Sequence, residues 1–328
     1  MNERGGELRD LVLSLAELDK DSIAAQVTKL GLDGIGVAES AGGSGGTLGD
    51  LLVVVEEFAG SGTSTSLVES SCALWVHSRC DDRRAYNPQT ALKVLTARLR
   101  DDETPKVLTE VPWAHLCERL IVVDGVGYVY DIDIAATQVT MVCNVAGEAR
   151  DTVVIGPNAG MKIGEVNVEA LRCRLALLRT ASILGAAKGA YRVTKEHVEA
   201  RHQFGLPLIR ISAVAAQLAL MKTHVLQIQS AFDRAVAIYE TRGEDELRAA
   251  ALIASVMATA SAGFVARTAH QLHGAIGTTA EHALHRYTRA LWAWCDDDGT
   301  PRHRRQQLGN LALTDGETLF WDKLTAPA

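Results

Sequence analysis

The sequence predicts a mainly helical protein with a small antiparallel β unit between two helical regions. Leucine stripes at helical spacing run through residues 7–80, and longer helical patterns fill the C-terminal half. Between them, β-branched and aromatic residues gather in short runs. We therefore expect an N-terminal helical domain at 1–105, a reduced β domain at 106–165 and a C-terminal four-helix bundle at 166–328.

Composition limits the classes of function. The 328 residues include 33 Lys and Arg against 40 Asp and Glu, and the net charge of −7 repels nucleic-acid phosphates. The one dense basic run, Arg302-His303-Arg304-Arg305, is typical of a solvated helix face. The sequence has no apolar run of the roughly eighteen residues that a membrane helix needs, and it begins without an apolar secretory core. We expect a cytoplasmic protein that binds neither nucleic acid nor membrane.

Short helices joined by glycine-rich turns are expected in the N-terminal region. A stripe of Leu51, Leu52, Val55 and Phe58 predicts one of them, and a loop too rich in glycine to be helical fills residues 31–46. Residues 90–101 have the composition of a further helix, ahead of Pro105.

The β unit is predicted from five short runs of strand-forming residues. Asp124-Gly125, between two of these runs, is a turn signal and indicates an antiparallel arrangement that ends near Gly164. The runs are 106–111, 119–123, 128–132, 138–143 and 152–155.

Four long helices are predicted for the C-terminal region, at 168–199, 212–241, 245–273 and 279–294. One face of the first helix narrows to small residues, which allows another helix to approach closely. That face carries Leu171, Leu175, Leu178, Ser182, Gly185 and Gly189.

Three turns of the C-terminal region could carry chemistry. The first runs from Arg201 to Leu208, where Gly205 and Pro207 force a turn between two long helices. An arginine there can fork onto a phosphate while Phe204 packs on a planar ring. Alternatively, the arginine caps carbonyl groups or pairs with an acid.

The other two turns are individually weaker signals. Residues 271–278 are expected to form a glycine-rich helix end, where Gln271 offers an amide to a diphosphate or a ribose. A helix that simply ends in glycine has the same sequence pattern. In Asp297-Asp298-Gly299-Thr300, a carboxylate before a glycine could serve as a general base, although such acidic turns are common loops.

Together and in this order, the three turns resemble the C-terminal domain of the acyl-CoA dehydrogenase superfamily. In that family, an Arg-x-x-Phe-Gly-x-Pro turn and a Gln-x-x-Gly-Gly-x-Gly turn of one subunit hold the pyrophosphate and adenosine side of the FAD bound by its neighbour. The residues at matching positions are Arg201, Phe204, Gln271, Gly274 and Gly277, with Ala275 in place of the second glycine. The resemblance places the family's catalytic Glu-Gly-Thr on Asp298-Gly299-Thr300. Residues 38–45 also resemble the family's Pro-Glu-x-x-Gly-Gly-x-Gly loop, so the likeness covers nearly the whole chain.

The chain departs from this pattern where the family holds the flavin ring. Complete members place a Thr-Glu-Pro and then a Gly-Ser-Asp on the β domain, and later a Trp-Ile-Thr/Ser strand. Here Thr109-Glu110 is followed by Val111-Pro112-Trp113-Ala114-His115, and no tryptophan occurs between Trp113 and Trp292. The β unit is also short, and Asp298 is one methylene shorter than the usual glutamate. Some members carry the base on an earlier helix instead, at a position that falls near Leu175, where no acid is present.

The resemblance therefore implies the shortened subunit of a two-gene FAD enzyme, similar to actinobacterial heterotetrameric acyl-CoA dehydrogenases of steroid side-chain thioesters. It implies a full-length partner in an α2β2 assembly, an acyl-CoA substrate that undergoes α,β-dehydrogenation, and an electron-transfer flavoprotein-like acceptor. Two other functions stay open: a self-sufficient homo-oligomeric dehydrogenase with Asp298 as its base, and a catalytically inactive scaffold subunit.

Neither cysteines nor histidines suggest a metal site. The six cysteines are scattered without a CxxC pair, which indicates buried or idle thiols. His270 with His273, and His282 with His285, have the spacing of two ligands on one helical face, but no glutamate is placed as in a zincin. We expect capping or surface roles for these histidines and no metal.

Overall fold

A computed structural model describes residues 3–80, 85–99, 104–157, 160–244, 246–316, 318 and 320–322. The chain divides into two compact units. Unit 1 comprises 1–54 and 64–174, and unit 2 comprises 55–63 and 175–328. The three domain boundaries expected from the sequence stay a prediction.

Unit 1 begins with short helices, as predicted. Asp19 caps the second of them, because its side chain accepts a hydrogen bond from the backbone N–H of Ser22 at 3.0 Å. Helix α4 (Leu67–His77) is buried from Leu67 to Val76, so it forms the centre of the helical part of this unit. The helices are α1 (Glu3–Leu15), α2 (Lys20–Lys29), η1 (Leu32–Gly34), η2 (Glu39–Ala41), the start of α3 (Leu48–Gly60) and α4 (Leu67–His77).

The β part of unit 1 consists of two small sheets, with strand orders β1-β3-β4-β7 and β2-β6-β5. Alternate residues of the strands point into one apolar cluster that includes Val111, Leu120, Val122 and Val153, all fully buried. The strands are β1 (Thr90–Val94), β2 (Lys106–Pro112), β3 (Arg119–Val123), β4 (Tyr128–Asp133), β5 (Gln138–Thr140), β6 (Arg150–Ile155) and β7 (Met161–Glu165), with η3 (Ala114–Leu116) and η4 (Ile134–Ala136) between them. The five predicted strands are therefore confirmed.

The helix predicted at 90–101 is wrong. Residues Thr90–Val94 form β1, which pairs in parallel with β3, while the other ladders of the two sheets are antiparallel. Alanine, leucine and lysine favour a helix locally, but the pairing with β3 buries Ala91 and Leu92 and satisfies the backbone. Tertiary pairing thus overrides the local preference here.

The predicted turn at Asp124-Gly125 is confirmed, and its aspartate holds it. The fully buried side chain of Asp124 accepts hydrogen bonds from the backbone N–H groups of Val126, Gly127 and Tyr128 at 3.0–3.1 Å. A carboxylate that accepts three backbone donors satisfies the tight turn between β3 and β4 without water.

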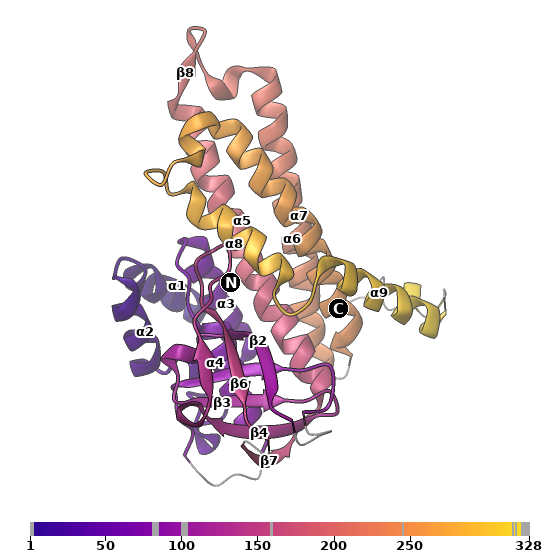
Figure 1. The fold of residues 1–328 in the computed structure, drawn as a ribbon. Helices are drawn as coiled ribbons and strands as arrows, with labels where there is room; N and C mark the ends of the chain where they lie inside the picture. The colour runs from indigo at the N-terminus through magenta and orange to yellow at the C-terminus, as the bar shows by residue number, and fades with distance from the viewer. Residues whose placement is uncertain are drawn as a thin grey trace. The chain divides into compact units, whose positions relative to one another are not determined.

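Unit 2 is a helical bundle (Figure 1). Its main helices fall where the sequence places them, and one further helix follows them. They are α5 (Val168–Ala200), α6 (Ser212–Arg242), α7 (Leu247–His273), α8 (Leu284–Asp296) and α9 (Pro301–Asp315), with the short elements β8 (His202–Gln203), β9 (Leu206–Pro207), η5 (Leu208–Arg210) and η6 (Gly274–Thr278) between them. A mainly helical fold with a small β part is therefore confirmed.

Helix α7 is long and apolar enough to cross a membrane by length and composition. In this structure it packs along α6 and against α8 and α9, and its small residues from Ala249 to Ala269 are largely buried. It is accordingly the central helix of the bundle.

The small-residue face of α5 receives another helix, as the sequence predicts. A methyl group added at Gly185 would overlap the backbone oxygen of Glu56 and lie 2.9 Å from the nitrogen of Gly60, both on the second half of α3. Lys188, one turn on, donates to Glu56 Oε1 at 2.5 Å. The two backbones therefore meet at a distance that only glycine permits.

We expect Gly185→Ala to lower the free energy of unfolding by about 1–3 kcal/mol, because the added methyl group forces α3 and α5 apart. Urea unfolding followed by circular dichroism measures this. The matched control is Gly309→Ala on α9, where an added methyl group meets no atom within 4 Å. The control should be neutral or stabilising by up to about 1 kcal/mol, and equal destabilisation by both changes would contradict the close helix contact.

Candidate functional site

The Arg201 turn is a short hairpin that projects from the end of α5. Strands β8 and β9 pair His202 with Pro207 and Gln203 with Leu206. At the tip, Phe204 adopts a positive φ of 53° and Gly205 one of 78°. Phe204 is 91% exposed, which is exceptional for a phenyl ring on a protein surface. The hairpin therefore presents an aromatic side chain to whatever lies outside the bundle.

Arg201 itself is exposed at the base of this hairpin. Its backbone is fixed, because its N–H donates to His197 O and its carbonyl accepts from the N–H of Leu208 at 2.8 Å. Within the described part of the chain, its guanidinium makes neither a hydrogen bond nor an ion pair. The alternative in which this arginine caps carbonyl groups or pairs with an acid therefore finds no support.

The Gln271 turn ends α7 and continues into η6. Gly274 has a positive φ of 63°, and its N–H donates to the carbonyl of His270. Gln271 is exposed, whereas Gly277 is buried, and a side chain there would meet His273 Cβ at 2.7 Å. Gly274 is thus needed for the backbone conformation and Gly277 for packing.

A small apolar cluster holds the two turns at the same end of the bundle. Val198, three residues before Arg201, packs with Leu272, which directly follows Gln271. Leu208 and Ile209, directly after the hairpin, pack against the same cluster. The hairpin lies at one end of the α5–α6–α7 bundle in Figure 1. Two turns that are 70 residues apart in sequence (201 and 271) thereby form one surface, which we call the clamp surface (Arg201, Phe204, Gln271, Gly274 and Gly277). Its residues are exposed except for Gly277, which is buried beneath them.

Asp298 does not belong to the clamp surface. Its Oδ2 accepts a hydrogen bond from Arg179 Nε at 3.2 Å, and Asp297 Oδ2 lies 3.4 Å from Arg179 Nη2. The Arg179 side chain is only 6% exposed. Asp298 adopts a positive φ of 59°, a conformation that aspartate and asparagine tolerate better than most residues.

The basic run Arg302-His303-Arg304-Arg305 was expected to lie on a solvated helix face, and this is wrong for one of its residues. Arg302, His303 and Arg305 are exposed on α9, as predicted, but Arg304 is buried. Its guanidinium donates to the carbonyl of Cys295 at 2.5 Å and to the carbonyl of Asp297. Arg304 therefore closes the end of α8, because it satisfies carbonyl groups that the helix leaves unpaired.

Arg179 and Arg201 are separated by most of the length of α5. Twenty-two residues of helix correspond to about 33 Å along the axis. Asp298, which Arg179 holds, therefore lies far from the clamp surface. The two groups of residues cannot act on the same atoms of one ligand.

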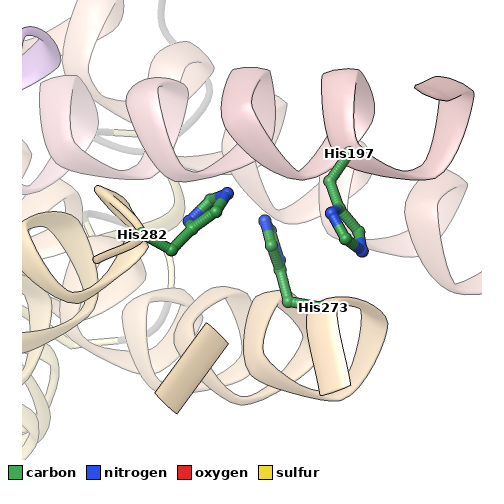
Figure 2. A group of neighbouring side chains, drawn as sticks. All are labelled: His197, His273 and His282. Atoms are coloured by element: carbon green, nitrogen blue, oxygen red, sulfur yellow. The ribbon is translucent and has the colours of Figure 1, made fainter. Parts of the chain in front are cut away.

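Three histidines meet near the clamp surface, and spacing in the sequence does not reveal them. His197 on α5, His273 at the end of α7 and His282 before α8 face one another (Figure 2). The pairs at helical spacing do not form this cluster: His270 Nε2 lies 3.0 Å from Thr288 Oγ1, and His285 Nδ1 lies 2.8 Å from the carbonyl oxygen of His282. Only side chains from distant segments, brought together by folding, form the three-histidine cluster (His197, His273 and His282).

In unit 1, a buried carboxylate of strand β6 holds the loop after β2. His115 Nδ1 and the backbone N–H of His115 both lie within 2.9 Å of Asp151 Oδ2. The other oxygen of this fully buried carboxylate accepts the N–H of Val142 at 3.2 Å. Trp113 at the start of this loop has a positive φ of 55°. The backbone N–H and the ring of His115 are thus both directed to Asp151.

The six cysteines all lie among the described residues, and no disulfide joins any of them. Burial raises the pKa of the Cys117 thiol to about 12 and that of Cys295 to about 11. Both thiols are therefore protonated at neutral pH, in agreement with the expected idle role.

We expect Arg179→Leu to lower the free energy of unfolding by about 3 kcal/mol, since it leaves two neighbouring carboxylates without their shared cation. Urea unfolding measures this, with Arg305→Leu on the exposed face of α9 as control. A change in Arg179→Leu no larger than that of the control would show that the ion pairs with Asp297 and Asp298 do not stabilise this turn.

The comparisons with known sequences agree on one family. Residues 169–293 match the family described as acyl-CoA dehydrogenase, C-terminal domain. The acyl-CoA dehydrogenase FadE28 of Mycobacterium tuberculosis is 31% identical over 129 residues, which are 38% of this chain. The match spans 36% of the length of that relative.

Solved structures resemble the chain over nearly its whole length. A variant of the Tcur3481–Tcur3483 steroid ACAD has a TM-score of 0.81 at 20% identity and covers 95% of this chain and 97% of its own. The ChsE4–ChsE5 complex from Mycobacterium tuberculosis has a TM-score of 0.80 at 18% identity, with 97% and 99% covered. Butyryl-CoA dehydrogenase from Megasphaera elsdenii has a TM-score of 0.77 at 16% identity, with 95% and 99% covered. The resemblance predicted from the sequence is therefore confirmed: residues 169–293 match the acyl-CoA dehydrogenase C-terminal domain, and the fold of nearly the whole chain is similar to that of acyl-CoA dehydrogenases.

Proposed function

We propose that this chain is one subunit of an FAD-dependent acyl-CoA dehydrogenase and that its clamp surface grips the diphosphate and adenosine side of FAD held by a partner chain. The carrying observation is the exposure of Arg201, Phe204 and Gln271 at one end of unit 2, with an arginine that has no acidic partner among the described residues. Exposed side chains that are held in position by a rigid backbone are suited to bind a ligand.

The chemistry of the clamp surface fits FAD. The guanidinium of Arg201 supplies a planar fork of donors for a diphosphate, and the phenyl ring of Phe204 supplies a flat apolar face for a planar ring. The side-chain amide of Gln271 can donate or accept at a phosphate or a ribose hydroxyl. All three side chains are exposed, so they can reach a cofactor that belongs to another chain.

The flavin ring itself is better assigned to the partner. An isoalloxazine needs hydrogen bonds to its ring atoms and a walled pocket. After β2, the residues that stand where the family carries Gly-Ser-Asp form a loop whose His115 binds Asp151 of β6. This supports a division in which the partner holds the ring and this chain holds the far end.

When bound, FAD supplies a hydride acceptor for the oxidation of a CH–CH bond. The residues of this chain bind FAD and orient it. Arg201 balances the charge of the diphosphate, and the apolar cluster around Leu272 keeps the two turns at a fixed position relative to one another. The proton is removed by a base of the partner chain, because Oδ2 of Asp298 is engaged by Arg179.

We infer further that the partner is a full-length acyl-CoA dehydrogenase-type chain in an α2β2 assembly. Two of the similar structures are the Tcur3481–Tcur3483 steroid ACAD and the ChsE4–ChsE5 complex. These likenesses support an assembly of two different chains and a steroid side-chain CoA thioester as substrate. An electron-transfer flavoprotein-like acceptor in the cytoplasm would complete the reaction.

The first test measures flavin retention after this chain is combined with its partner. We expect the chain alone to be colourless and the assembly to be yellow. Arg201→Ala should raise the flavin dissociation constant of the assembly by roughly 10–100-fold, the effect of one charge-assisted hydrogen bond. Flavin fluorescence after dilution measures this.

The matched control for this test is Arg305→Ala, which removes an exposed arginine on α9 and should leave flavin retention unchanged. One FAD bound per copy of the isolated chain would overturn the proposal. Equal retention in the wild type and in Arg201→Ala would instead favour the inactive scaffold, which stabilises its partner without touching the cofactor.

The second test addresses the self-sufficient enzyme with Asp298 as base. We expect Asp298→Asn to leave turnover of the assembly at the wild-type level, because Arg179 holds this carboxylate and asparagine also tolerates the positive φ. Turnover with an artificial electron acceptor measures this. Loss of a true base would lower the rate by roughly 10²–10⁴-fold, and such a loss with flavin still bound would establish the alternative.

A further inference from the structure

The three-histidine cluster has the composition and proximity of a metal site. One ligand nitrogen of each ring lies within 4.8 Å of the other two. The rings of His197 and His273 stack with centroids 4.5 Å apart, and the edge of His282 meets His273 at 4.6 Å. Figure 2 shows the rings converging from α5, from the end of α7 and from the segment before α8.

His273, at the centre of the cluster, carries an unused lone pair. Its Nδ1 lies 2.8 Å from the carbonyl oxygen of Ala269, and a carbonyl only accepts, so Nδ1 holds the ring proton. Its Nε2 is then an acceptor, and it has no hydrogen-bond partner among the described residues although His273 is only 6% exposed. A buried polar atom without a partner is costly, and it points to a ligand.

Burial also disfavours the charged state of two of the three rings. Burial lowers the pKa of His273 to about 4, and burial together with the neighbouring His282 and Arg201 lowers the pKa of His197. Both rings are therefore neutral at pH 7, as coordination requires. The carbonyl of Ala269 orients His273 in the way that second-shell groups orient metal-bound histidines.

We propose that His197, His273 and His282 bind one divalent transition-metal ion, with Zn²⁺ as the best match for three imidazoles and an open fourth position. An ion at the centre of the three nitrogens would lie within about 2.8 Å of each, against ~2.0–2.1 Å in a zinc site. Closing this gap requires the stacked rings of His197 and His273 to turn so that their lone pairs point at the same ion. The ion would tie α5 to the end of α7 and to the start of α8. This inference does not rest on the proposed function.

One contact changes when the ion binds. His282 Nδ1 accepts the backbone N–H of Leu284 at 3.1 Å, so the neutral ring holds its proton on Nε2. Coordination through Nε2 moves that proton to Nδ1, with no net release, and replaces the hydrogen bond to Leu284. Coordination through Nδ1 displaces the same bond. Metal binding therefore acts on the first turn of α8, whichever nitrogen is used.

The experiment titrates the full chain, in the assembly in which it purifies and after removal of metal by a chelator, with Zn²⁺ in a calorimeter. We expect one ion per chain. Co²⁺ in place of Zn²⁺ should give the visible absorption of a four-coordinate nitrogen site. His273→Gln should weaken Zn²⁺ binding by more than ~100-fold, because it removes a direct ligand.

The control is His303→Gln, which removes an exposed histidine on α9 and should bind Zn²⁺ as the wild type does. If His273→Gln fails to fold, as judged by circular dichroism, His197→Gln at a half-buried position takes its place with the same expectation. Zn²⁺ binding that survives both His197→Gln and His282→Gln, or a wild type that gives neither heat nor Co²⁺ absorption, would overturn the inference.

Discussion

The apolar contact between the end of α5 and the end of α7 is the constraint on which the clamp surface depends. Val198 and Leu272 are buried in one small cluster, and each lies within three residues of an exposed polar side chain, Arg201 or Gln271. Burial of these side chains fixes the two helix ends relative to one another. The side chains of Arg201 and Gln271 therefore need no contact with each other to be positioned. The hairpin can therefore project outward and still have a defined position.

The length of α5 separates two kinds of chemistry in unit 2. At one end, the donor groups of Arg201 and Gln271 are exposed. At the other, Arg179 and Arg304 satisfy the carboxylates and carbonyls of the turn after α8. A buried arginine that is paired with two acids is part of the fold, because removal of any partner leaves an uncompensated charge. The proposed role, which is to bind cofactor without supplying a base, rests on this contrast between exposure at one end and internal pairing at the other.

The three histidines add a second polar feature to the clamp end of the bundle. Burial removes solvation from His273 and in part from His197, and these two rings therefore favour the neutral state, in which a nitrogen lone pair is available. His273 belongs to the same turn as Gln271 and Gly274, so whatever occupies the cluster also sets the position of that turn. The end of α7 is thereby held by apolar packing on one side and by histidines on the other.

The sequence by itself determined the class of fold, the long helices of the bundle and five of the strands, because these follow from local periodicity. The residues of the clamp surface stay a prediction, made from short motifs. Tertiary structure decided the rest. Thr90–Val94 became a strand since pairing with β3 outweighed local helix preference, and Arg304 became buried since α8 ends beside it. The three-histidine cluster and the pairing of Asp298 with Arg179 join segments that are distant in the chain, and only packing of the helices brings such side chains together.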